Sequence, residues 1–295
     1  MTVVSFDSAV DANVAVTWRA ALRDIWRRHP TAVIGGVLLL LILLMAIFAP
    51  LLTSIEPNAL RPVRRLRWPS AEHWFGTDSI GRDIYSRVLY GARVSLLVGA
   101  SVAVLSTLIG LTIGLLSGFH RAVDAIVMRI MDGVMSIPPI LLAIALMALT
   151  KASIQIVIIA ITIAEIPRVS RLVRGIVLSL REQPFVEAAR AIGTRSWRIM
   201  LRHILPNTVA PLIVQATYIC ASAIITEAIL SFLGAGTPPN IPSWGNIIAE
   251  GRTYFLVSAY IILIPGAFLS VTVLAVNLVG DGLRDVLDPR MARRM

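Results

Sequence analysis

Long runs of residues without a single charge dominate this sequence. Residues 31–52 and 94–119 contain no acidic or basic side chain, and each run is long enough to cross a hydrocarbon core of roughly 30 Å as an α-helix. Only 15% of all residues are charged, whereas soluble domains average about 25%. Because backbone polar groups must bond internally in lipid, this pattern favours a bundle of membrane helices over a soluble domain.

Four more apolar stretches follow the first two. They cover residues 130–150, which contain Pro138, residues 152–164, which continue as a helix through Glu165 and Pro167, residues 208–233, which contain Glu227, and residues 256–280. The sequence therefore predicts an all-α polytopic membrane protein with six transmembrane helices.

The basic residues set the predicted orientation. The chain has 27 basic and 17 acidic residues, and all but Lys151 of the basic ones are arginine. Eighteen lie in the two terminal tails and the loops after spans two and four, and nine lie in the other loops. Since basic loops stay in the cytoplasm, both termini are predicted to be cytoplasmic. The charge thus reflects topology, and no nucleic-acid partner is expected.

These features divide the chain into five parts. They are a cytoplasmic tail with an interfacial amphipathic helix (1–30), transmembrane helix 1 (31–52), an extracytoplasmic segment (53–92), a core of helices 2–6 (93–280) and a cytoplasmic tail (281–295). Seven of the nine external basic residues, all arginines, lie between spans one and two. We expect the extracytoplasmic segment to be a small folded cap, which partly explains its charge.

The chain lacks the motifs of the common catalytic centres. Its one lysine, Lys151, follows Thr150 and therefore cannot belong to a phosphate-binding loop that ends in Gly-Lys. Its four histidines are far apart, and Cys220 is its only cysteine. We therefore expect that this chain has no enzyme activity of its own and that it binds no metal ion and no cofactor.

A long basic loop, residues 181–207, separates spans four and five. Pro184 can open a helix, Gly193 can end it in a left-handed turn, and Thr194 or Ser196 can cap a second helix that ends at Pro206. Four side chains form the expected apolar stripe on the second helix: Trp197, Met200, Leu201 and Ile204. The loop is predicted to stand off the membrane as a helix–turn–helix, and the alternative is an amphipathic loop on lipid headgroups.

The loop resembles the EAA loop of ABC importer permeases. Glu187, Ala188 and Ala189 are followed after three residues by Gly193 and then by Leu205-Pro206. His203 replaces the family's isoleucine, a change typical of the peptide branch. Further motifs are similar to the C-type permeases of dipeptide, oligopeptide and nickel importers over about residues 25–290. They include Phe75-Gly-Thr-Asp78, Gly81-Arg-Asp83, Pro242-Ser-Trp-Gly245 and Gly280-Asp-Gly-Leu-Arg-Asp285.

This resemblance implies a type I importer permease in the bacterial cytoplasmic membrane. The implied partners are the lipid bilayer, a B-type sister permease, two cytoplasmic ATPases that hold ATP and Mg²⁺, and an extracytoplasmic peptide-binding protein. The loop would act as the coupling helix that enters a cleft on one ATPase. The implied coupling residues are Glu187, Ala188, Ala189, Gly193, Trp197, Arg198, His203, Leu205 and Pro206.

Polar residues and prolines within the spans are candidates for the translocation pathway or its gate, since ionisable groups at membrane depth are often functional. The candidates are Glu227, Pro138, Ser222 and Asn277. For Glu227 the alternative is a structural carboxylate bonded to a neighbouring span. Asp132 with Arg129, and Glu165 with Arg168, are predicted ion pairs.

The second external segment, residues 234–252, contains several prolines and a tryptophan. We expect it to pack on the extracytoplasmic segment and to form with it the face that receives the binding protein. The docking candidates are Trp244, Pro242, Asp78 and Arg82. A purely structural cap is the alternative.

Three other functions remain open from the sequence alone. Nickel or metal-chelate import would use the same fold, although no track of His, Met or Cys along a span supports it. A secondary transporter or channel driven by an ion gradient would favour inverted repeats, and none is visible. A membrane receptor coupled to an ATPase is the fourth possibility.

Overall fold

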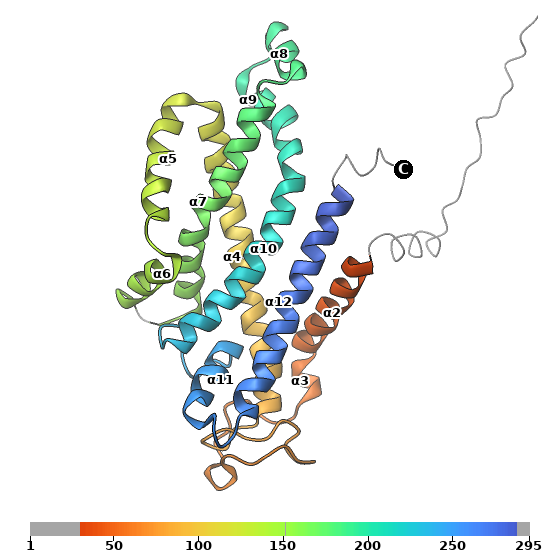
Figure 1. Ribbon diagram of the computed structural model, residues 1–295, viewed down its shortest axis with the longest axis vertical. Coiled ribbons are helices and arrows are strands. Elements are labelled where there is room, and N and C mark those ends of the chain that lie inside the picture. Colours follow the sequence, from red (N-terminus) through yellow and green to blue (C-terminus); the bar gives the residue numbers. More distant parts are fainter. Residues whose placement is uncertain (1–29, 151, 288–295) are drawn as a thin grey trace, which may run out of the picture.

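The computed structural model describes residues 30–150 and 152–287, which are mainly helical apart from irregular segments at 53–83 and 233–243 (Figure 1). Within those ranges the only β pairing is an isolated bridge between Thr77 and Asp83. The prediction of an all-α chain is confirmed. The amphipathic helix expected before residue 30 and the C-terminal arginines from Arg290 onward lie outside the described residues.

The long helices lie side by side in an elongated bundle (Figure 1). They are α2 (Pro30–Ile47), α4 (Ile84–Phe119), α7 (Ile154–Leu180), α10 (Leu205–Phe232) and α12 (Tyr260–Leu287). A short α3 (Ala49–Leu52) extends α2. The loop helix α8 (Pro184–Ala191) lies at one end of the bundle, and α11 (Trp244–Gly251) lies at the other with the segment that precedes α4 (Figure 1).

Helix α4 begins ten residues earlier than the apolar run predicts. Asp83 caps it by accepting a hydrogen bond from the Ser86 backbone N–H at 2.8 Å. The sequence analysis missed this first part because Arg87 interrupts the apolar pattern, whereas the structure buries that arginine in an ion-pair network.

Small residues on α4 allow close packing against α7. A Cβ added to Gly114 would lie 2.6 Å from the Val173 Cβ and 2.7 Å from the Ser170 carbonyl oxygen. Gly110 and Gly118 meet Val169 and Val177 in the same way. One glycine every four residues thus forms a flat stripe on which α7 lies.

The third predicted span is broken rather than continuous. It consists of α5 (Arg121–Met135) and α6 (Pro139–Ala148), whose axes differ by 88°. Pro138 has an extended backbone with ψ 131°, and proline also disfavours a helical conformation in the residue before it. The pair is therefore either a broken span or a re-entrant loop.

Among the described residues, four helices are long and apolar enough to cross a membrane, or five if the bent pair counts as one span. Helix α7 runs through Pro167 as predicted. Helix α7 is the one long helix of the described residues that is not among these candidate spans. It carries four charged residues: Glu165, Arg168, Arg171 and Arg174. The count of six spans stays a prediction.

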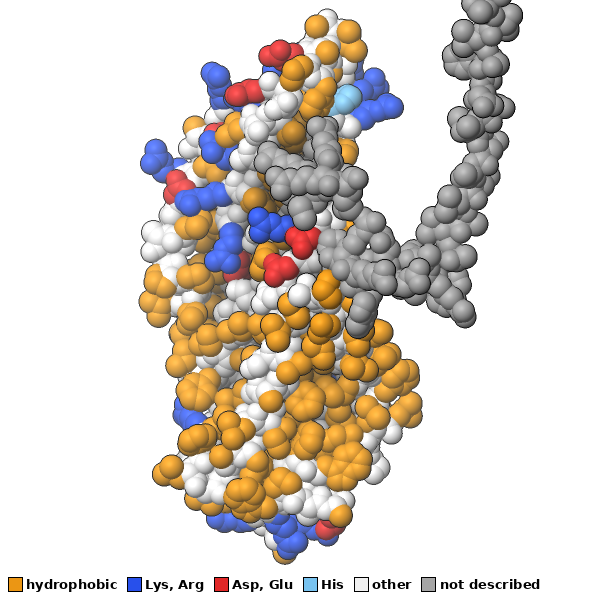
Figure 2. All heavy atoms as spheres, turned by 45° about the vertical axis from the view of Figure 1, so that its right-hand side comes forward, with side chains coloured by type: hydrophobic (Ala, Val, Ile, Leu, Met, Phe, Trp, Pro, Cys, Tyr) orange, Lys and Arg blue, Asp and Glu red, His pale blue; other side chains and the backbone are white. Residues whose placement is uncertain are grey.

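Two groups of buried apolar side chains hold the bundle together. The larger one lies between α4, α6, α7 and α10 and includes Val98, Val157 and Ile219. The smaller one lies near α11 and includes Ile84 and Trp244. On the face drawn in Figure 2, exposed apolar side chains form a broad belt, and most charged side chains lie beyond it toward the two ends.

Candidate functional site

The basic loop forms the tip of the molecule at the predicted cytoplasmic end (Figure 1). Helix α8 (Pro184–Ala191) begins with Pro184 at its first turn, as expected. Gly193 has a left-handed φ of +80°, and the Thr194 N–H donates to the Ala189 carbonyl at 3.0 Å. The predicted helix opened by proline and closed by a left-handed glycine is confirmed.

The predicted coupling residues divide into an outer and an inner group. Glu187 and Ala188 are exposed on α8, whereas Ala189 is buried against the rest of the loop. Two exposed apolar residues were missed by the sequence analysis: Phe185 and Ile192, the latter 82% exposed. Because they flank the Glu-Ala-Ala motif, the tip presents an apolar surface around a carboxylate.

The second helix of the loop does not end at Pro206. Helix α9 (Ser196–Ile199), a π-helical turn (Met200–Ile204) and α10 form one continuous helix of 37 residues. The Leu205 N–H donates to the carbonyl of Met200, five residues back, so the chain adopts a wider turn before the proline. Pro206 follows directly after this wider turn, as the second residue of α10.

The wider turn also changes which side chains face inward. Ile199 and Ile204 are buried, whereas Trp197 and Leu201 are exposed. The predicted apolar stripe is therefore wrong at these two positions, because a π turn shifts the helical register. Arg195, rather than Thr194 or Ser196, occupies the cap position, and it makes no side-chain cap.

Contacts across the turn join α8 to the π-helical segment. The Phe185 and His203 rings lie 6.4 Å apart, and the Asn207 side-chain amide donates to the His203 carbonyl at 2.7 Å. Arg198 is exposed beside the Trp197 ring, with its guanidinium carbon 5.8 Å from the ring centroid. The loop is thus a formed unit connected to α10 and not a loose linker.

At the opposite end, the four docking candidates are all buried. The Trp244 side chain is fully enclosed and donates from Nε1 to the Val88 carbonyl at 3.1 Å. Pro242, Asp78 and Arg82 are buried as well. Their burial corrects the expectation of an exposed face and favours the alternative, a structural cap.

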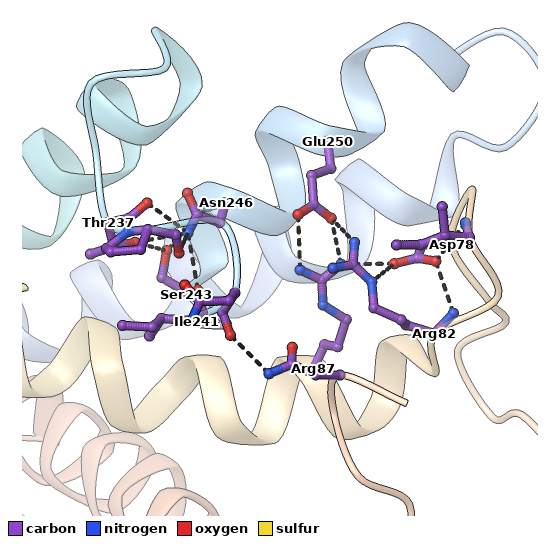
Figure 3. A network of polar contacts seen from close by, with 12 residues as sticks. Asp78, Arg82, Arg87, Thr237, Ile241, Ser243, Asn246 and Glu250 are labelled. Carbon is purple, nitrogen blue, oxygen red and sulfur yellow. Dashed lines mark hydrogen bonds and ion pairs between the residues drawn. The ribbon is translucent and has the colours of Figure 1, made fainter. Parts of the chain in front are cut away.

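An ion-pair network builds this cap (Figure 3). Arg87 donates from Nη1 to Asp78 at 2.8 Å and to Glu250 at 2.5 Å, and Arg82 donates from Nε to Asp78 at 2.5 Å and also reaches Glu250. The network therefore joins the segment before α4 and α4 itself to α11. The contribution of Glu250 could not be read from the sequence, because it lies more than 160 residues from both arginines.

Glu227 lies inside this subunit rather than on an open face. Its Oε1 accepts hydrogen bonds from the hydroxyls of Ser231 and Ser243, both at 2.8 Å, and its side chain is fully buried. Ser243 also caps α11. This placement favours the structural alternative, in which the carboxylate ties α10 to α11.

The remaining predicted pathway residues lie apart from one another. Pro138 is exposed at the break between α5 and α6, while Ser222 on α10 and Asn277 on α12 are half-buried. None of the three lines the cavity of about 670 Å³ between α7, α10 and α12. The polar residues that line this cavity were not among the predicted pathway residues: Asn207, Gln215, Tyr218 and Arg284.

Ion pairs connect α5 to α7. Asp132 pairs with Arg171 at 2.5 Å and not with Arg129, and Asp124 pairs with Arg174. The predicted partner, Arg129, is on the same helix as Asp132. The sequence pattern alone does not indicate that α7 packs beside α5. The predicted pair of Glu165 with Arg168 is present at 3.1 Å.

Comparison with family models gives two matches. Residues 106–293 match the binding-protein-dependent transport system inner membrane component, and residues 17–69 match the N-terminal TM domain of oligopeptide transport permease C.

Curated relatives match over most of their length. A probable peptide ABC transporter permease protein of Sinorhizobium fredii is 54% identical, with 91% of this chain and 92% of the relative covered. The dipeptide transport system permease protein of Alkalihalophilus pseudofirmus is 44% identical, with 93% and 90% covered. The oligopeptide transport system permease protein of Bacillus subtilis is 38% identical, with 94% and 90% covered.

Solved structures with a similar fold include a methionine transporter. A chain of the inward-facing MetNI methionine ABC transporter aligns with a TM-score of 0.56 at 23% identity, covering 68% of this chain and 96% of that one. At this identity the likeness concerns the fold alone.

Proposed function

The chain belongs to the family of inner-membrane components of binding-protein-dependent transport systems, and from this premise we propose that it is the permease subunit of an ATP-driven importer of peptides. Relatives named as peptide, dipeptide and oligopeptide permeases support this substrate class. The names favour peptides over nickel or a metal chelate, and the family does not favour a secondary transporter.

One observation carries the proposed role of the loop. Helix α8 stands at the tip of the molecule, and its partner helix α9 continues without a break into α10. A partner that moves α8 therefore moves a helix that crosses the whole bundle. We assign the role of coupling helix to α8, with Glu187, Ala188, Phe185 and Ile192 as its contact residues on an ATPase.

The supporting residues hold this helix in place. Gly193 sets the turn, Ala189 packs inside the loop, and His203 contacts Phe185. Leu205 and Pro206 join the loop to α10. Trp197 and Arg198 are exposed on α9 and would border the same contact.

The proposed assembly contains this chain, a B-type sister permease, two cytoplasmic ATPases and an extracytoplasmic peptide-binding protein. ATP and Mg²⁺ would be held by the ATPases. Ser222 and Asn277, on the two helices that border the cavity, are proposed to face the peptide pathway in the assembled pore. Closure of the ATPases would shift the pore between two states, each favoured by a different ligand.

Reconstitution tests this function directly. The complete complex in proteoliposomes should import a labelled dipeptide only with ATP inside and the binding protein outside. A matched complex whose ATPases lack the catalytic base serves as the control. Uptake driven by a proton gradient without ATPases would contradict the proposal and favour a secondary transporter.

A further inference from the structure

The external arginines divide into two kinds in the structure. Arg82 and Arg87 are buried and paired with Asp78 and Glu250. Arginines outside the cytoplasm oppose the charge bias that orients membrane proteins, and this network accounts for two of them. Four of the other external arginines lie in a short segment that we call the arginine loop, residues 60–68.

Three arginines of this loop are exposed and form no salt bridge with a described residue. Within the described ranges, no carboxylate lies within salt-bridge distance of Arg61, Arg65 or Arg67, whereas Arg64 pairs with Glu72. The only other exposed acid of segment 53–83 is Glu56. The nearby carboxylates of Asp78 and Asp83 are buried in pairs of their own. The exposed surface therefore has an uncompensated positive charge.

The backbone of the arginine loop is fixed from beneath. The Thr77 N–H donates to the Arg67 carbonyl at 2.9 Å, and the Tyr260 hydroxyl donates to the same oxygen at 2.9 Å. The Leu66 N–H donates to the Asp78 carbonyl at 2.9 Å. These bonds anchor the loop on the buried segment that precedes α4, so its surface is formed before any partner arrives.

Two backbone features also indicate that this loop is held in place. Leu66 has a φ of +51°, which a branched side chain rarely adopts. Gly81 has a φ of +83°, and a Cβ there would overlap the Arg61 carbonyl. The contacts around Leu66 maintain its strained conformation, whereas glycine adopts a positive φ without strain.

Apolar side chains alternate with the arginines. Leu60 and Trp68 are more than 60% exposed, and Val63 is 89% exposed. Apolar contacts ringed by charge are typical of a protein-binding surface. Figure 1 places the segment at the end of the molecule beyond α11, and Figure 2 shows blue arginine side chains at that end, beyond the apolar belt. The surface therefore faces along the bundle axis and away from the lipid.

We propose that the arginine loop is a docking surface for an acidic patch on the extracytoplasmic binding protein. This inference rests on the proposed function and identifies the residues of this chain that contact that partner. Three unpaired arginines would attract an acidic surface and speed its association, and Val63 and Trp68 would supply apolar contact. The buried candidates Trp244, Pro242, Asp78 and Arg82 support this surface from below.

The test measures binding of the purified cognate binding protein to the complete transporter in nanodiscs of zwitterionic lipid. The triple variant Arg61→Gln, Arg65→Gln, Arg67→Gln should bind about tenfold more weakly, mainly through a slower association rate. Arg93→Gln is the matched control, because Arg93 is also exposed but lies on the flank of α4. It should bind like the wild type. Raising the salt concentration should weaken the wild type more than the triple variant.

The outcomes separate this inference from the function on which it rests. A wild-type complex that binds no peptide-binding protein would contradict the proposed function itself. A triple variant that binds as well as the wild type, with the same salt dependence, would overturn the docking surface alone. A defect that appears only in nanodiscs with anionic lipid would assign the arginines to headgroups and also overturn it.

Discussion

A side chain at position 193 would stand in open space and yet be strained. No atom lies within 4 Å of the place that a Cβ would take, but the backbone φ is +80°. Gly193→Ala should therefore lower the free energy of unfolding by about 1–2 kcal/mol and reduce peptide uptake, because the turn after α8 would distort. Thermal unfolding of the purified complex and uptake in proteoliposomes measure the two effects.

Gly175 on α7 provides a matched control. It too has open space for a Cβ, but its φ lies outside the left-handed region. Gly175→Ala should leave the complex unchanged or stabilise it by up to about 1 kcal/mol, because alanine favours helices. Equal behaviour of the two alanine variants would refute the assignment of Gly193 to a strained turn.

Reversing one charge on α8 tests its contact with an ATPase. Glu187 is exposed beside apolar side chains, so Glu187→Lys should reduce ATPase co-purification or ATP-driven uptake at least tenfold while membrane insertion persists. Glu182→Lys reverses an exposed charge in the same loop just before α8 and should have a much smaller effect. Normal uptake in Glu187→Lys would argue against α8 as the coupling helix.

Glu227 offers a test of structural against pathway roles. Glu227→Gln keeps an oxygen that can accept from Ser231 and Ser243, so it should retain most stability and transport. Glu227→Ala leaves those buried hydroxyls without their acceptor and should cost about 1–3 kcal/mol. If Gln abolishes uptake in a stably folded complex, the carboxylate charge itself is needed and the structural role is insufficient.

Among the helices, the contact of α4 with α7 depends on its glycine stripe. Gly114→Ala would place a Cβ 2.6 Å from the Val173 Cβ, so the helices must separate or shift. Overpacking of this kind costs about 1–3 kcal/mol. Thermal unfolding should show a lower midpoint for Gly114→Ala than for Gly133→Ala, whose Cβ would meet nothing within 4 Å. Equal midpoints would mean that the bundle adjusts without cost.

The apolar runs predicted most of these helices, because crossing lipid demands long uncharged stretches. The early start of α4 was missed, since Arg87 is neutralised by residues from distant parts of the chain. The bend at Pro138 and the passage of a helix through Pro206 illustrate a second limit. Proline restricts the chain at both places, but packing and a π turn decide whether the helix breaks or continues.

The candidate site could also be predicted only in part from the sequence. The turn at Gly193 and the helix from Pro184 follow from local rules that hold in any context. Exposure does not follow from such rules. Trp244 and Arg82 have the chemistry of a binding surface but lie buried, whereas Phe185 and Val63 are apolar and face outward.

Over the whole molecule, the ion-pair network holds the external cap together. Arg87 is fully buried and bonds both Asp78 and Glu250. Arg87→Ala would leave Arg82 to pair with both carboxylates, and removing one partner from a buried ion pair typically costs about 3–5 kcal/mol. The segment before α4 should then become sensitive to protease from the external side, whereas Arg93→Ala should not. An equally resistant Arg87→Ala chain would show that the network is dispensable.

The unbroken helix from Ser196 to Phe232 sets the geometry of any signal between the two ends. At about 1.5 Å per residue, Glu227 lies about 46 Å along the axis from Ser196. A tilt of about 10° at the loop would displace Glu227 by about 8 Å, and through Ser243 it would also displace the start of α11. Bending is favoured at the π turn and at Pro206 and Pro211, all near the loop end of the helix, so the rest of the helix tilts as a unit. Closure of the ATPases and movement of the cap around α11 should therefore occur together. The transport cycle should contain no intermediate in which only one end of this helix has moved.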